Sequence, residues 1–104
     1  MFNFTAECKK ASAIGMENYV FFYGSLDGVE VGSPCDSEAE SLADAENVLT
    51  REEPYTLEEY LQEEVDWYES ALLRSKTESV KEELTSGLQL RRQLLEKVLA
   101  FKAA

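Results

Sequence analysis

The sequence predicts a small α+β domain, with a short antiparallel sheet in the N-terminal third and three helices packed on one face of that sheet. Three observations support this: a β-hairpin signal about Asp27-Gly28, two helical patterns that follow capping residues, and a long amphipathic pattern near the C-terminus. The chain has 104 residues, of which 44% are hydrophobic. That composition can close one core, so we expect a single domain over residues 1–104.

The sheet is expected within residues 1–33. Residues 2–8, FNFTAEC, alternate apolar and polar side chains with the period of a half-buried strand, although a short amphipathic helix is the alternative. The later segment NYVFFYGSLDGVEVGSP is rich in aromatic and β-branched residues and has Asp27-Gly28 at its centre. Because this dipeptide tolerates the positive φ angles of a type I′ turn, the segment predicts a hairpin, which Pro34 ends.

The hairpin turn fixes which residues face each other. Leu26 is expected opposite Val29, and Gly24 opposite Val31. One face of the ribbon then carries Val20, Phe22, Leu26, Val29 and Val31. The other face carries Tyr19, Phe21 and Tyr23. A sheet in a small domain usually has one covered face, so this second aromatic row is either wrapped by the rest of the chain or offered to a partner.

Three helices are expected, over residues 37–51, 56–74 and 77–102. Ser37 and Glu40 have the spacing of a capping box at the start of the first helix, and Pro54 is expected to end it. The stretch YTLEEYLQEEVDWYESALL begins the second helix. Thr56 is its expected N-cap, with Glu59 returning a hydrogen bond to the Thr56 amide. Tyr55 and Tyr60 form the expected hydrophobic staple around the cap.

The third helix has one broad apolar face, which carries Val80, Leu84, Leu88, Leu94, Leu95, Val98 and Phe101. Gly87 lies on this face and marks either a close helix crossing or a kink. Arg91, one turn later, either lays its stem over the core or makes an ion pair in a self-association interface.

Negative charge is concentrated in the middle of the chain. The formal net charge is −11, and residues 27–69 hold fifteen acidic residues against one basic residue, Arg51. Such a segment repels phosphates and anionic lipid headgroups. Nucleic acid and membrane are therefore not expected as direct partners, whereas a basic protein surface is.

The second helix separates its apolar and acidic side chains. On a helix of about 100° per residue, one arc collects the core residues Leu57, Leu61, Val65, Tyr68 and Leu72. The carboxylates and two aromatic rings fall outside this arc, where they suit an Arg- and Lys-rich partner. The predicted partner-binding residues are Glu59, Tyr60, Glu63, Glu64, Asp66 and Trp67, extended by Asp44, Glu52 and Glu53. The predicted anchor is Trp67.

Several chemistries are not expected. The chain has no histidine, so it lacks the commonest general base and zinc ligand. Cys8 and Cys35 form no Cys-x-x-Cys motif, and the glycines match no nucleotide-binding fingerprint. We therefore expect no enzyme activity, no cofactor and no metal site, and the two cysteines are expected to stay reduced in the cytoplasm.

The function predicted from these features is that of a small non-catalytic binding protein. It would inhibit or regulate a basic, nucleic-acid-binding partner by presenting carboxylates at the positions where phosphates normally bind. An inhibitor encoded by a phage or by its host would have these properties. The alternative is a homo-oligomeric structural or assembly subunit. Tyr19, Phe21, Tyr23 and Arg91 would then mediate self-association, and the acidity would serve solubility only.

Overall fold

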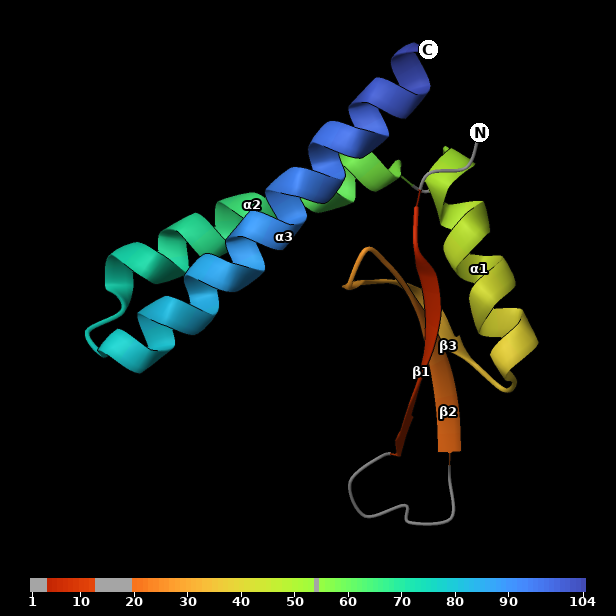
Figure 1. Cartoon of the computed structure of the whole chain (residues 1–104), viewed down its shortest axis with the longest axis horizontal. Coiled ribbons are helices and arrows are strands. Elements are labelled where there is room, and N and C mark those ends of the chain that lie inside the picture. Colours follow the sequence, from red (N-terminus) through yellow and green to blue (C-terminus); the bar gives the residue numbers. More distant parts are fainter. Residues whose placement is uncertain (1–3, 13–19, 54) are drawn as a thin grey trace. The chain divides into compact units, whose positions relative to one another are not determined.

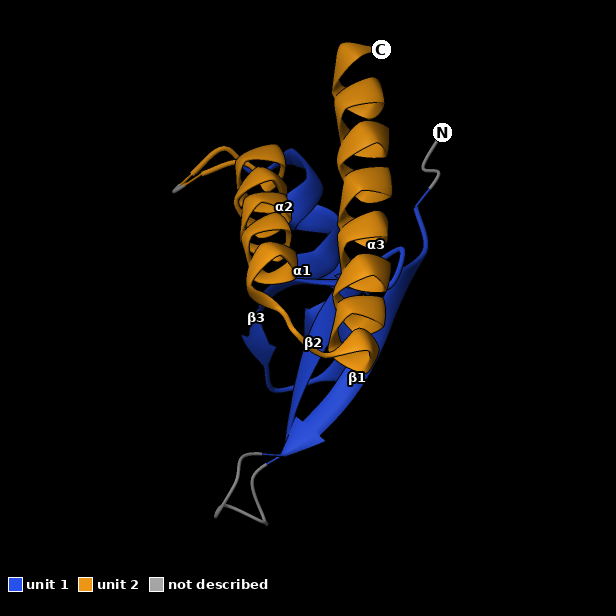
Figure 2. Cartoon of the chain, turned by 90° about the vertical axis from the view of Figure 1, so that its left-hand side faces the viewer, with its two compact units in different colours: residues 1–51 blue, residues 52–104 orange. Residues whose placement is uncertain are grey.

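The computed structural model describes residues 4–12, 20–53 and 55–104, which form three strands followed by three helices (Figure 1). The elements are β1 (Ala6–Ser12), β2 (Val20–Leu26), β3 (Val29–Cys35), α1 (Glu38–Thr50), α2 (Leu57–Arg74) and α3 (Glu78–Ala103). The predicted α+β class is confirmed. The contacts divide the chain into two compact units, residues 1–51 and 52–104 (Figure 2). The single domain over the whole chain stays a prediction.

The first unit contains an antiparallel sheet in the order β1-β2-β3. Asp27 and Gly28 have φ angles of 49° and 85°, and Leu26 pairs with Val29, so the predicted turn and register are confirmed. The segment predicted at residues 2–8 contributes a strand that starts later, at Ala6, so the helical alternative is wrong. This strand continues to Ser12 because it pairs with β2 along its whole length. Residues 2 and 3 lie outside the described residues.

The third strand contains an irregularity that the sequence did not reveal. Phe22 pairs with Cys35 and Gly24 with Val31, so β3 holds extra residues between these pairs. Gly32 there has a φ of 81°, a conformation that favours glycine, and a Cβ atom on it would collide with the Asp44 carboxylate. The strand runs through Pro34 instead of ending before it, because an edge strand with a bulge tolerates proline.

Helix α1 covers one face of the sheet (Figure 1). Its N-cap is Ser37, as predicted, whose hydroxyl accepts a hydrogen bond from the Glu40 amide at 3.2 Å. The buried apolar residues of this unit are Phe4, Leu26, Val29, Val31, Ala45, Val48 and Leu49. A Cβ atom on Gly24 would lie 2.5 Å from the backbone oxygen of Ser41 and 2.7 Å from Cβ of Ala45. Glycine at this position therefore allows α1 to approach the sheet closely.

The second unit is an antiparallel hairpin of α2 and α3. Its buried residues are Leu57, Leu61, Val65, Leu88, Leu94 and Val98. Thr56 caps α2 by accepting a hydrogen bond from the Glu59 amide at 3.2 Å, and the Tyr55 and Tyr60 rings stack with centroids 6.3 Å apart. The predicted cap and staple are thus confirmed. The Glu59 carboxylate, however, accepts from the Thr56 hydroxyl (3.3 Å) and not from its amide.

Helix α3 is continuous from Glu78 to Ala103, so the kink considered at Gly87 is wrong and the close crossing is confirmed. A Cβ atom at Gly87 would lie 2.6 Å from Cε1 of Tyr68. Val80 and Phe101, assigned to the apolar face, are exposed. Pro54, the expected helix stop, lies outside the described residues, and the predicted packing of α2 and α3 on the sheet stays a prediction.

Candidate protein-binding face

The carboxylates of α2 divide into an inner set and an outer set. The inner set forms ion pairs with cations of α3, which the sequence pattern did not predict. The pairs are Glu58 with Lys102 at 2.7 Å, Glu69 with Arg92 at 2.8 Å, and Glu64 with Arg91 at 3.6 Å. Because the two helices are antiparallel, residues early in α2 meet residues late in α3. These acids therefore stabilise the hairpin and offer little charge to a partner.

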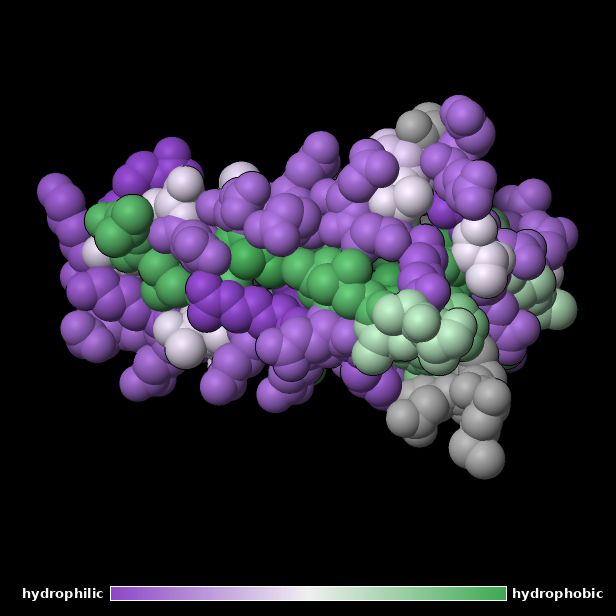
Figure 3. Space-filling view, turned by 90° about the horizontal axis from the view of Figure 1, so that it is seen from above, coloured by the Kyte–Doolittle hydropathy of each residue, from purple (hydrophilic) through white to green (hydrophobic). Residues whose placement is uncertain are grey.

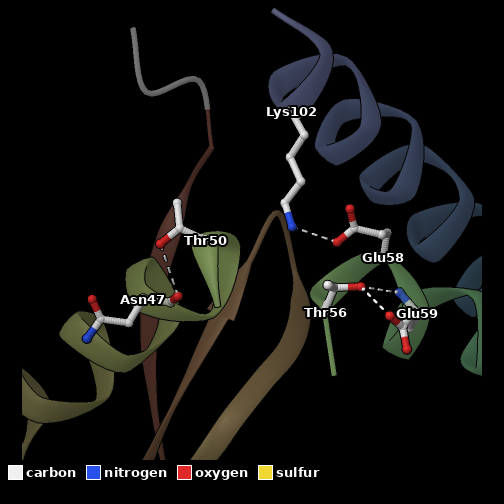
Figure 4. A network of polar contacts seen from close by, with 6 residues as sticks. All are labelled: Asn47, Thr50, Thr56, Glu58, Glu59 and Lys102. Carbon is white, nitrogen blue, oxygen red and sulfur yellow. Dashed lines mark hydrogen bonds and ion pairs between the residues drawn. The ribbon is translucent and has the colours of Figure 1, made fainter. Parts of the chain in front are cut away.

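The Glu58–Lys102 pair lies at the open end of the hairpin (Figure 4), with both side chains about three-quarters buried. Partial burial alone would raise the pKa of Glu58 and is the largest single influence on it. The hydrogen bonds that the carboxylate accepts from Lys102, a backbone amide and Thr56, together with the charge of Lys102, outweigh burial, so the pKa is lowered. Because the pKa of Glu58 is lower in the folded state than in the unfolded state, ionised Glu58 stabilises the fold at pH values above its unfolded-state pKa. This stabilisation is lost as the pH falls through the folded-state pKa.

We therefore expect a pH-dependent coupling between Glu58 and Lys102. In a double-mutant cycle with Glu58→Gln and Lys102→Met, the coupling free energy should be about 0.5–1 kcal/mol at neutral pH. It should disappear on acidification, when Glu58 becomes neutral. Urea unfolding across this pH range measures it. The matched cycle of Glu78→Gln and Lys81→Met, on a much more exposed pair, should show almost no coupling at any pH, and a pH-independent coupling at Glu58 would contradict the assignment.

Arg91 is the centre of a second polar cluster within the hairpin. Its Nη1 donates to the Gly87 carbonyl at 3.1 Å, and its guanidinium carbon lies 4.5 Å from the centroid of the Tyr68 ring. Glu64 approaches Arg91 and also accepts a hydrogen bond from the Tyr60 hydroxyl at 3.0 Å. Of the predicted interface residues, Tyr60, Glu64 and Arg91 are thus engaged inside this unit.

The outer set of acids lies on the opposite side of α2 and consists of Glu59, Glu63 and Asp66. None of the three makes an ion pair within the part of the chain that the structure describes. Asp66 accepts a hydrogen bond from Gln62 at 3.0 Å. Trp67 lies beside them with 56% of its surface exposed, and its ring meets Tyr68 edge-on at 5.1 Å. We call Glu63, Asp66 and Trp67, together with Glu59, the outer face of α2.

The other predicted interface residues lie elsewhere. Asp44 belongs to the first unit, where its carboxylate accepts a hydrogen bond from the Ser33 amide at 2.9 Å. Glu52 and Glu53 are exposed residues that precede α2. Phe21 and Tyr23 are half-buried on the sheet face opposite α1, with ring centroids 6.3 Å apart. Tyr19 lies outside the described residues.

Apolar side chains also remain at the surface of the hairpin. The exposed large ones in α2 and α3 are Trp67, Leu73, Val80, Leu90, Leu99 and Phe101. On the face seen in Figure 3, hydrophobic residues form a band along the hairpin between rows of hydrophilic ones. Self-association through Tyr19, Phe21, Tyr23 and Arg91 stays a prediction.

Both cysteines are free and half-buried. Partial desolvation, together with the nearby carboxylates of Asp44, Glu40 and Asp36, raises the pKa of the Cys35 thiol. This thiol donates to the Ser33 carbonyl at 3.3 Å, so it is not activated as a nucleophile. Among the described residues, no group of three or more carboxylates and thiols is placed to bind a metal ion, and no helix is long and apolar enough to cross a membrane.

Comparison of the chain with protein-family models, with curated proteins and with solved structures gives no significant match.

Proposed function

We propose that the protein binds a basic, nucleic-acid-binding protein through the outer face of α2 and thereby blocks the partner's access to nucleic acid. The observation that carries this proposal is the separation of the α2 acids into two sets. Glu58, Glu64 and Glu69 are paired with cations of α3, whereas the outer acids lie beside the exposed Trp67 and make no ion pair with any residue that the structure describes.

The outer face is unfavourable for the isolated chain. Glu59 and Glu63 are four residues apart, and such like-charged pairs cost about 0.2–0.5 kcal/mol on a helix. Exposing most of a tryptophan leaves apolar surface in water. Both costs are relieved when a surface rich in arginine and lysine covers the face, because the carboxylates then accept charge-assisted hydrogen bonds and the indole receives a cation.

The negative charge also determines how a partner approaches. The net charge of −11 on the chain attracts a basic surface and so increases the rate of association with it. This increase becomes smaller as the salt concentration rises. A groove that normally binds phosphates has the same charge requirement, so nucleic acid and the outer face compete for it. The acids supply steering and specificity, while Trp67 supplies most of the affinity as a central apolar anchor.

The test compares two charge reversals of equal size in the same unit. Glu63→Lys/Asp66→Lys alters the outer face, and Glu82→Lys/Glu83→Lys alters exposed acids of α3 that make no ion pair within the described residues. Glu59 is left intact because it contacts the N-cap of α2. Wild type and both variants are immobilised and exposed to nuclease-treated host lysate at low salt, and a captured protein is purified for titration.

The outer-face reversal should weaken binding at least about tenfold and flatten its salt dependence, while the α3 reversal should change it less than about threefold. Trp67→Ala should weaken binding by a similar factor with the salt dependence unchanged. Oligonucleotides should compete with the wild type for the purified partner. If the two charge reversals weakened binding equally, net charge alone would explain the loss. The proposal that the outer face of α2 is a specific binding surface would then be refuted.

A further inference from the structure

The outer edge of β1 is a second surface with a definite pattern. In the order β1-β2-β3, one edge of β1 has no strand partner within the described residues. The Asp27 amide donates to the Thr5 carbonyl at 2.9 Å, so the peptide groups of Thr5 point towards β2. Because these directions alternate along an antiparallel strand, the outward peptide groups belong to the even-numbered residues. These are Ala6, Cys8, Lys10 and Ser12.

Such an edge can pair with another strand, and lysines commonly prevent this in natural sheets. Lys9 and Lys10 are exposed on β1, but Glu7 is exposed two residues before Lys9 and on the same face of the sheet. The edge therefore carries charges of both signs in an order that can complement itself. A second copy of the chain, with its β1 antiparallel to the first, presents the charges of Glu7 and Lys9 in the reverse order and is therefore the matching partner.

Charge selects one register among the symmetric ones. With the two-fold axis at Cys8, Glu7 lies opposite Lys9 of the second copy, and Lys9 lies opposite Glu7 of that copy. With the axis at Lys9, the Lys9 side chains of the two copies face each other. With the axis at Lys10, the two Lys10 side chains face each other. Opposite charges in directly facing positions stabilise a strand pair, and like charges destabilise it. Only the axis at Cys8 forms two attractive pairs.

We propose that two copies of this chain associate along β1, antiparallel and centred on Cys8, so that their sheets join. The outward peptide groups of Cys8 in the two copies then exchange hydrogen bonds, which places their Cα atoms about 5.5 Å apart. The Glu7–Lys9 pairs flank this centre on the sheet face opposite α1. The net charge of −11 on each chain opposes association, so the dimer forms at high protein concentration.

Sedimentation equilibrium of the full chain at physiological ionic strength, up to millimolar concentration, tests the register. Glu7→Lys or Lys9→Glu alone should raise the dissociation constant about tenfold or more, because two attractive pairs become repulsive. The double swap Glu7→Lys/Lys9→Glu should restore it to within about threefold of wild type. Lys10→Glu makes the same charge change as Lys9→Glu but falls opposite Ala6, so it should have little effect.

Cross-linking gives an independent readout. In a Cys35→Ser background, oxidised glutathione should link the Cys8 thiols of the two copies in a disulfide, because the expected Cα separation is within disulfide range. The two thiols lose two protons and two electrons, and these reduce the glutathione disulfide to two glutathione thiols. A cysteine moved along the strand, in Cys8→Ser/Ala11→Cys/Cys35→Ser, should cross-link much more slowly. A wild type that stays monomeric, or a dimer that neither the single reversals nor the double swap changes, would overturn the proposal. The test is separate from the proposed function, because Glu63, Asp66 and Trp67 remain unaltered.

Discussion

Replacing Gly24 with alanine is expected to destabilise the first unit by about 1–3 kcal/mol, the range for overpacking a close contact. Elsewhere in a strand the same change would be favourable, since glycine costs about 0.5–1 kcal/mol relative to alanine. Here the new Cβ atom would meet the Ser41 backbone oxygen at 2.5 Å and Cβ of Ala45 at 2.7 Å. A backbone oxygen within a helix cannot move alone, so α1 must shift away from the sheet.

Urea unfolding gives the change in stability, and amide hydrogen exchange locates it. Exchange should accelerate in α1 and β2. Ser25→Ala is the control on the neighbouring residue, because the buried Ser25 hydroxyl has no hydrogen-bond partner within the described residues and its removal should be neutral or slightly stabilising. A Gly24→Ala protein as stable as wild type would show that α1 and the sheet are not in this contact.

The elements set by local chemistry could be predicted from the sequence. Asp27-Gly28 determined the turn and hence the pairing of Leu26 with Val29, and Ser37 and Thr56 marked the helix starts. The role of Gly24 could not be predicted in the same way. Its place opposite Val31 followed from the turn, but the closeness of Ser41 depends on how a distant helix lies on the sheet. The bulge at Gly32 has the same origin, since the Asp44 carboxylate stabilises it from α1.

The sequence predicted which acids of α2 lie outside its core, but not which of them form ion pairs with α3. Helical periodicity separated the carboxylates of α2 from its core, but it could not distinguish Glu64, which approaches Arg91, from Glu63, which does not. That distinction depends on the position of α3. The antiparallel order of two adjacent helices gives a partial signal, because it brings the acidic start of α2 near the basic end of α3 and so suggests Glu58 with Lys102.

Replacing Arg91 with methionine is expected to have the largest effect of any single charge removal in the hairpin, about 2 kcal/mol. The Arg91 and Glu64 side chains are only 15% and 26% exposed, so the loss leaves a carboxylate partly desolvated beside Tyr60. The contacts of the guanidinium with the Gly87 carbonyl and the Tyr68 ring disappear as well. Methionine keeps a similar length and apolar stem, so the change reports mainly on the polar contacts.

The neighbouring Arg92 provides the matched control. Its pair with Glu69 is shorter, at 2.8 Å, but both side chains are about half exposed, so Arg92→Met should cost at most a few tenths of a kcal/mol. Thermal or urea unfolding of the two variants compares them directly. If distance alone decided the strength of these pairs, Arg92→Met would be the more damaging change. If burial and the contacts of Arg91 with Tyr68 and Gly87 decide the strength, Arg91→Met will be the more damaging change. Adding Glu64→Gln to Arg91→Met should then recover part of the lost stability, because the double variant no longer leaves the Glu64 charge without its partner.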